Sequence, residues 1–134
     1  MISIEEPLAS WVLLVARVCL ASVFLVSGVH KAVWYKQAVA EFRLAKAPLV
    51  SVTLPATIAL HLLGSLCLIF GVFTAEVALV LAAFTLLATE RAHGFWRYDG
   101  SARLVRSRIA LANLGLIGGL LLLAVTGAGR LAIG

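Results

Sequence analysis

The chain alternates between long hydrophobic runs and shorter connections that hold most of its charged residues. Residues 8–29 contain a single charge, Arg17, and residues 109–128 contain none. A helix needs about 20 mostly apolar residues to cross the hydrocarbon core of a bilayer, so both runs are long enough to span it. Because lipid cannot satisfy free backbone polar groups, each run is expected to be helical.

Two further runs lie between these. Residues 49–73 have no formal charge but include His61, and residues 75–88 are bracketed by Glu76 and Glu90, whose side chains can reach the membrane interface. Four strands would be too few to close a barrel. The pattern therefore predicts an all-α fold, an integral membrane four-helix bundle that forms a single domain over residues 1–134. The helices are expected at about residues 8–30, 49–73, 75–93 and 109–128.

The composition agrees with a lipid environment. Hydrophobic residues make up 63% of the 134 residues and charged residues 13%, whereas soluble domains are about 45–50% apolar and about 25% charged. A water-facing surface would need more charge, which excludes a soluble enzyme domain, a disordered tail, a coiled coil and a nucleic-acid-binding module. Glu5 and Glu6, rather than basic residues, precede the first run, so we expect that run to be retained and not cleaved as a signal peptide.

The basic residues are unevenly distributed. Nine of the eleven Lys and Arg lie in two connections, residues 30–48 and 91–108, which fall on one side of the membrane if there are four crossings. Cytoplasmic loops are enriched in Lys and Arg, so we expect both loops to be cytoplasmic and both termini to lie outside. An amphipathic interfacial segment is expected around Trp34 and Phe42, and Trp96 is expected to anchor the second loop.

Arg17 and His61 are the ionisable residues expected at membrane depth, where such groups are functional candidates by default. A buried arginine costs about 2.5–3.5 kcal/mol on insertion scales. Arg17 is therefore expected either to face the bundle, as an anchor or ligand contact, or to snorkel outward. His61 is expected near mid-bilayer with Ser65 as its hydrogen-bond partner. It is either a satisfied core histidine, or a proton relay or cofactor ligand.

A cluster of polar residues is expected where the runs meet the basic loops. Lys31 ends the first run, Glu90, His93 and Trp96 end the third, and Asn113 lies about one turn into the fourth. Glu90 and His93 share a helical face and are expected to pair with Lys31 beneath Trp96. The cluster is either a ligand or partner pocket, or a salt-bridge collar that closes the bundle.

No metal site is expected, and haem is disfavoured. Cys19 and Cys67 form no CxxC pair. Two histidines at matched depth on facing helices would suggest haem, but His30 and His93 both fall near the basic interface, away from His61. A quinone stays open as a cofactor.

Short motifs occur in a fixed order along the four runs: residues 16–17 (AR), 27–31 (SGVHK), 64–74 (GSLCLIFGVFT), 84–87 (FTLL) with His93 and 95–96 (FW), 113–119 (NLGLIGG) and 126–129 (TGAG). In their order and spacing the chain resembles the DoxX family of small bacterial membrane proteins. The resemblance implies a four-helix protein of the plasma membrane, associated with thiosulfate–quinone oxidoreductase subunits and with complexes that handle oxidative and thiol stress. Many relatives carry Glu where this chain has His61, so a carboxylate partner for Arg17 is not assumed.

Three functions follow as hypotheses. The first is a membrane subunit that docks a quinone or a redox partner, either a soluble oxidoreductase or another membrane subunit, and has no complete active site of its own. The second is a small proton-coupled transporter, in which His61 is the deep titratable group. The third is a structural assembly factor. The spacing of Gly115 and Gly119 suits close packing, either within the bundle or in a homo-oligomer.

Overall fold

The computed structural model describes residues 5–133, and that part of the chain contains helices and no strand. Residues 1–4 and 134, the two ends of the expected domain, lie outside the described residues. The helices are α1 (Leu8–Val33), α2 (Tyr35–Leu44), α3 (Val50–Phe70), α4 (Thr74–His93) and α5 (Gly100–Thr126), with a short 3₁₀ turn, η1 (Phe95–Arg97), before α5.

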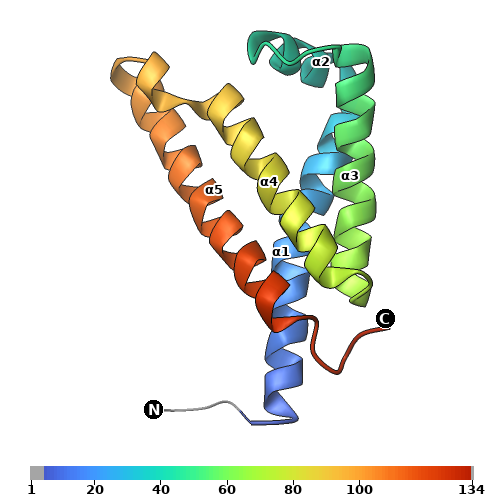
Figure 1. Cartoon of the computed structure of the whole chain (residues 1–134). Helices are drawn as coiled ribbons and strands as arrows, with labels where there is room; N and C mark the ends of the chain where they lie inside the picture. The colour runs from blue at the N-terminus through green and yellow to red at the C-terminus, as the bar shows by residue number, and fades with distance from the viewer. Residues whose placement is uncertain (1–4, 134) are drawn as a thin grey trace.

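The four long helices form two antiparallel pairs. Helix α1 packs mainly along α3, and α4 packs mainly along α5, while the two pairs meet chiefly through α3 and α4. In Figure 1 α4 passes over the middle of α1, the first turns of α1 extend beyond the other helices, and the two pairs diverge toward α2 at the opposite end. Both basic connections lie at the end of the molecule where α2 lies, which we call the basic end. Helix α5 finishes at the opposite end.

Three helices have the length and apolar composition needed to cross a membrane: α1, α3 and α5. In α4 the uncharged stretch between Glu76 and Glu90 is about 20 Å long at 1.5 Å per residue, shorter than the about 30 Å hydrocarbon core. That the charged ends of α4 reach the membrane interfaces stays a prediction. The prediction of a helical membrane protein is confirmed, with α4 as its shortest apolar segment.

The helix ends differ from the sequence-based expectation at the basic end. Helix α5 begins at Gly100 rather than near residue 109, and α1 continues to Val33. At 27 residues, α5 is about 40 Å long and so extends beyond the hydrocarbon core. Its additional turns contain Arg103, Arg106 and Arg108. The helix extends beyond the apolar run because the residues outside the run also have adequate helix propensity.

The core lies in the half of the bundle away from the basic end. It is built mostly of small and branched side chains, which let helices approach closely in lipid. Gly64 of α3 receives Leu81 of α4, and Gly119 of α5 receives Leu20 of α1. The buried core residues are Ala21, Phe24, Leu68, Ala78, Leu81, Ala82, Leu120 and Leu123.

Candidate functional site

Arg17 faces the bundle and is completely buried. Its Nη1 donates hydrogen bonds to the carbonyl oxygens of Leu68 and Ile69, each at 3.1 Å, and its Nη2 donates to the carbonyl of Leu131. The last carbonyls of a helix have no partner within the helix and carry the negative end of its dipole. Arg17 therefore satisfies the C-terminus of α3 and acts as an anchor rather than as a snorkelling side chain.

The segment after α5 closes over this anchor. We call residues 127–133 the C-terminal strap. The Ile133 amide donates to the carbonyl of Phe70 at 2.8 Å, which pairs the strap with the end of α3. Gly71, at φ +74°, ends α3, and a β-carbon at this position would collide with Ala132 and Arg17. Glycine is therefore required there both for the backbone conformation and for the close approach of the strap.

His61 is buried in the middle of α3. Neither ring nitrogen has a hydrogen-bond partner among residues 5–133. The ring lies between Phe24 of α1 and Phe84 of α4, with centroid separations of 5.4 and 5.1 Å and edge-on geometry. The expected bond with Ser65 is wrong, because the Ser65 hydroxyl donates to the carbonyl of Leu62 at 2.8 Å. Serine in a helix commonly bonds to the backbone one turn earlier.

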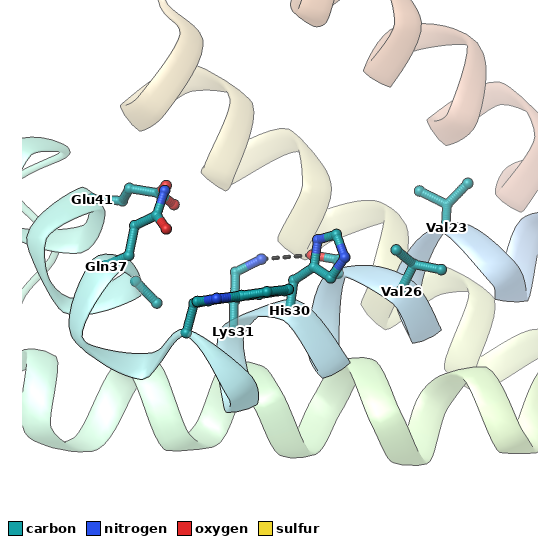
Figure 2. Close-up of a pocket in the computed structure, with 9 residues that line it drawn as sticks. Val23, Val26, His30, Lys31, Gln37 and Glu41 are labelled. Carbon is teal, nitrogen blue, oxygen red and sulfur yellow. Dashed lines mark hydrogen bonds between the residues drawn. The ribbon is translucent and has the colours of Figure 1, made fainter.

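Lys31 lies in an open groove of about 380 Å³ where α2 folds back over the end of α1. Its Nζ donates to the hydroxyl of Ser27, one turn earlier on α1. Figure 2 shows this hydrogen bond, with Gln37 and Glu41 of α2 on one side and two valines on the other. We call this the Lys31 groove. Its lining residues are Val23, Val26, Ser27, His30, Lys31, Trp34, Gln37, Ala38 and Glu41.

The groove is amphipathic along its length. Val23 and Val26, which belong to the apolar run of α1, lie at one end of the groove. Hydrogen-bonding side chains gather at the other end, where the apolar run finishes. His30 and Trp34 pack edge to face with a centroid distance of 5.1 Å, which fixes an imidazole beside an indole at the rim. A site of this kind can hold a ligand with a polar ring and an apolar tail.

The remaining predicted residues form a second cluster at the end of α4, and they do not pair with Lys31. Glu90 accepts a hydrogen bond from Arg97 at 2.9 Å, the one salt bridge among residues 5–133. Arg97 also lies over the Trp96 ring, 5.5 Å from its centroid. Trp96 is 57% exposed, so it borders the cluster and does not cover a closed pocket. The expected Lys31–Glu90–His93 contact is therefore wrong.

His93 and Asn113 tie the α4–α5 pair together. Arg106 of α5 approaches His93 Nδ1 at 3.1 Å, and Asn113 donates to the Thr89 hydroxyl at 2.9 Å. His93 lies beyond the charged end of the apolar stretch of α4. Burial and the nearby Arg106 lower the pKa of His93, while Glu41 opposes them. A neutral imidazole with Nδ1 free can accept the hydrogen bond from Arg106.

Glu41 is the residue that the sequence-based reasoning did not single out. It lines the Lys31 groove, and its negative charge opposes the lowering of the His93 pKa. Glu41 therefore belongs to the groove and also influences the cluster at the end of α4. The signal available in the sequence was its position as an acidic residue within the strongly basic first connection.

No group of three or more His, Cys, Asp or Glu side chains is placed to hold a metal ion among residues 5–133. Cys19 and Cys67 are both free thiols, one exposed and one partly buried. The predicted site residues therefore lie in three places: at the Arg17 anchor, at His61 and at the basic end.

The fold and its polar ends define a small multi-pass helical membrane protein with an open groove at one membrane interface. The sequence matches the DoxX family over residues 12–94, and the chain belongs to this family. It is 34% identical over 120 residues to the inner membrane protein YqjF of Escherichia coli K12, an alignment that covers 90% of this chain and 87% of that one.

A second relative is the inner membrane protein YphA of the same organism. It is 24% identical over 121 residues, which cover 90% of this chain and 86% of the relative. No solved structure matches the chain. With three helices able to cross a bilayer, the protein is an integral protein of the bacterial inner membrane.

Proposed function

We propose that this DoxX-family protein is a membrane subunit that docks a quinone in the Lys31 groove and works with a redox partner. The observation that carries the proposal is the groove's division into an apolar and a polar part. A quinone has carbonyl oxygens that accept hydrogen bonds, a ring that packs against aromatic side chains, and a hydrocarbon tail. The groove volume of about 380 Å³ falls within the range of ligand sites, about 300–1,000 Å³.

The position of the groove along α1 supports the same ligand. Lys31 and His30 lie in the last turn of α1, where the apolar run ends. A quinone ring bound there keeps its tail alongside Val23 and Val26 and within the hydrocarbon, so the ligand need not leave the bilayer to bind. Lys31, His30 and Gln37 supply the donors that its carbonyl oxygens need.

The redox partner is proposed to dock at the basic end. Its exposed cations include residues on α2, the α2–α3 connection, α4 and α5, and we infer from the enrichment of cytoplasmic loops in Lys and Arg that this end faces the cytoplasm. A soluble oxidoreductase with an acidic surface complements that charge. The exposed cations are Lys36, Arg43, Lys46, Arg91, Arg97, Arg103 and Arg108.

The test is a quinone titration of the purified protein in nanodiscs, read by quenching of tryptophan fluorescence. Trp34 lines the groove, so a short-chain ubiquinone analogue is expected to quench it saturably and Trp34→Phe is expected to remove that component. Lys31→Met is expected to weaken binding at least about tenfold, because a hydrogen bond from a charged group contributes about 1.5–3 kcal/mol. Lys36→Met, which removes a cation outside the groove, is the matched control.

Two results would contradict the proposal: quenching that never saturates, or equal affinities for Lys31→Met and Lys36→Met. Co-purification of a soluble oxidoreductase that dissociates at high salt is the expected result for the partner. A membrane subunit with a purely structural role would keep the activity of its complex when Lys31 is replaced.

His61 favours a second candidate, a proton-coupled transporter. A buried imidazole with no hydrogen-bond partner in the described structure carries a cost in stability, and intramembrane ionisable residues often serve proton relays. Substrate uptake into proteoliposomes by the wild type and by His61→Ala decides this candidate. Unchanged flux in the variant would exclude the relay.

A further inference from the structure

We propose that His61 is a proton-binding group coupled to the Lys31 groove, so that binding of an electronegative head group at Lys31 is accompanied by uptake of a proton at His61. This inference rests on the quinone site proposed above and concerns its regulation. The step is an acid–base one: imidazole plus a proton from water gives imidazolium, and no electrons are transferred.

Lys31 of the groove and His61 of α3 both lie close to one turn of α1. Lys31 follows Gly28 by about one helical turn on α1. On the other side of Gly28, the His61 β-carbon lies 3.1 Å from the place where a β-carbon of residue 28 would be. Ser27, which accepts the hydrogen bond from Lys31, is adjacent to Gly28 in the chain. Through Gly28, the part of α1 that carries Lys31 therefore packs directly against the turn of α3 that carries His61 and Leu62.

The surroundings of His61 make it sensitive to the charge of Lys31. The side chains that contact its ring edge-on, Phe24 of α1 and Phe84 of α4, carry no charge. On α3 itself the Ser65 hydroxyl donates to the Leu62 carbonyl and not to His61. The charged side chain Lys31 lies about one turn of α1 beyond Gly28, which packs against His61. Because apolar surroundings screen charge poorly, the ammonium of Lys31 opposes a second positive charge at His61.

An occupant of the groove changes this balance. When an electronegative oxygen accepts a hydrogen bond from Lys31, it offsets part of the ammonium charge, and protonation of His61 becomes more favourable. Coupling between two binding sites is reciprocal. Protonation of His61 must therefore strengthen binding in the groove by the same factor, and couplings of this kind amount to about 5–150-fold. We expect about tenfold.

The experiment is nitrogen NMR of histidine-labelled protein in nanodiscs, with and without the short-chain ubiquinone analogue. The chain has three histidines, so single variants assign every signal. The titration midpoint of His61 is expected to rise by about one pH unit when the analogue is bound, which corresponds to the tenfold coupling. A His61 midpoint that stays the same with and without the analogue would overturn the inference.

Binding affinities of variants provide the second measurement. The wild type is expected to bind the analogue about tenfold more tightly at low pH than at high pH. His61→Gln is expected to lose this ratio, and His61→Phe, which suits the aromatic surroundings, is expected to lose it too. His93→Gln changes a histidine that does not line the groove and is expected to keep it.

His30, at the rim of the groove, is the main alternative site at which the proton could bind. If the pH dependence disappears in His30→Gln but survives in His61→Gln, the proton binds at the rim and the inference is wrong. If the analogue fails to bind the wild type at any pH, the quinone site itself is wrong. Binding that is tight but independent of pH contradicts the proton coupling alone, so the two failures can be told apart.

Discussion

Arg17 offers the most direct energetic test of the bundle. It is fully buried, and its guanidinium donates to the last carbonyls of α3 and to the C-terminal strap. Arg17→Met keeps a long apolar stem and removes these donors. The perturbation therefore separates the anchoring hydrogen bonds from the packing of the side chain.

The expected loss of unfolding free energy depends on what happens to each carbonyl that Arg17 no longer hydrogen-bonds. The carbonyls of Leu68 and Ile69 stay inside the membrane without a donor, at a cost of about 1–3 kcal/mol each. The carbonyl of Leu131 can turn to water once the strap is released, so it adds little. Removing a buried cation offsets part of this cost, since an arginine at membrane depth is itself unfavourable by about 2.5–3.5 kcal/mol. We expect a net destabilisation of about 1–3 kcal/mol.

Thermal unfolding in detergent and hydrogen exchange measure the two consequences. Arg17→Met is expected to unfold at a lower temperature, and the Ile133 amide, which donates to Phe70, is expected to exchange faster. Arg130→Met makes the same chemical change at an exposed position on the strap and is expected to shift stability by less than about 0.5 kcal/mol. Equal melting of the two variants, with Ile133 still protected in both, would refute the anchoring role.

Two further predictions concern packing and topology. Gly28→Ala places a methyl group 3.1 Å from the His61 β-carbon and is expected to cost about 1–3 kcal/mol in unfolding free energy. The control Gly118→Ala, whose methyl group meets nothing within 4 Å in the described structure, is expected to be tolerated. Equal melting temperatures of the two variants would contradict this packing. In whole cells, Arg130→Cys is expected to react with a membrane-impermeant thiol reagent and Lys46→Cys to stay protected, both in a background without the native cysteines. The opposite labelling pattern would reverse the proposed orientation.

The membrane fold was largely predictable because the solvent leaves few alternatives. Apolar runs of spanning length must be helical in lipid, and the charges mark where those runs end. The extension of α5 back to Gly100 was not predictable in this way. Outside the hydrocarbon the limit on a helix is its intrinsic propensity and capping, and the segment 100–108 contains residues that tolerate a helix.

The contacts at the basic end were predicted less well than the helices. Topology alone brings Lys31, Glu90 and His93 to one side of the membrane, but each finds a closer partner on its own helix pair. The 3₁₀ turn after α4 brings Arg97 back to Glu90. Such a turn depends on local backbone angles that spacing along a helix does not reveal.

The surroundings of His61 and Glu41 were hard to predict from the sequence for a similar reason. The sequence indicated the depth of His61, but its surroundings depend on which residues of α1 and α4 face α3. The role of Glu41 depends on how α2 is rotated over the end of α1. Both are properties of tertiary packing, which a single sequence pattern does not specify.

Photo-crosslinking with a short-chain quinone that carries a photoreactive group tests the central claim most directly. With the protein in nanodiscs, mass spectrometry of the labelled peptides is expected to place the crosslinks within residues 23–41, the segment that contains the lining residues of the Lys31 groove. An excess of unmodified quinone is expected to remove these crosslinks. Crosslinks spread over the lipid-facing surface of α5, or labelling that unmodified quinone does not reduce, would contradict a quinone site in the groove.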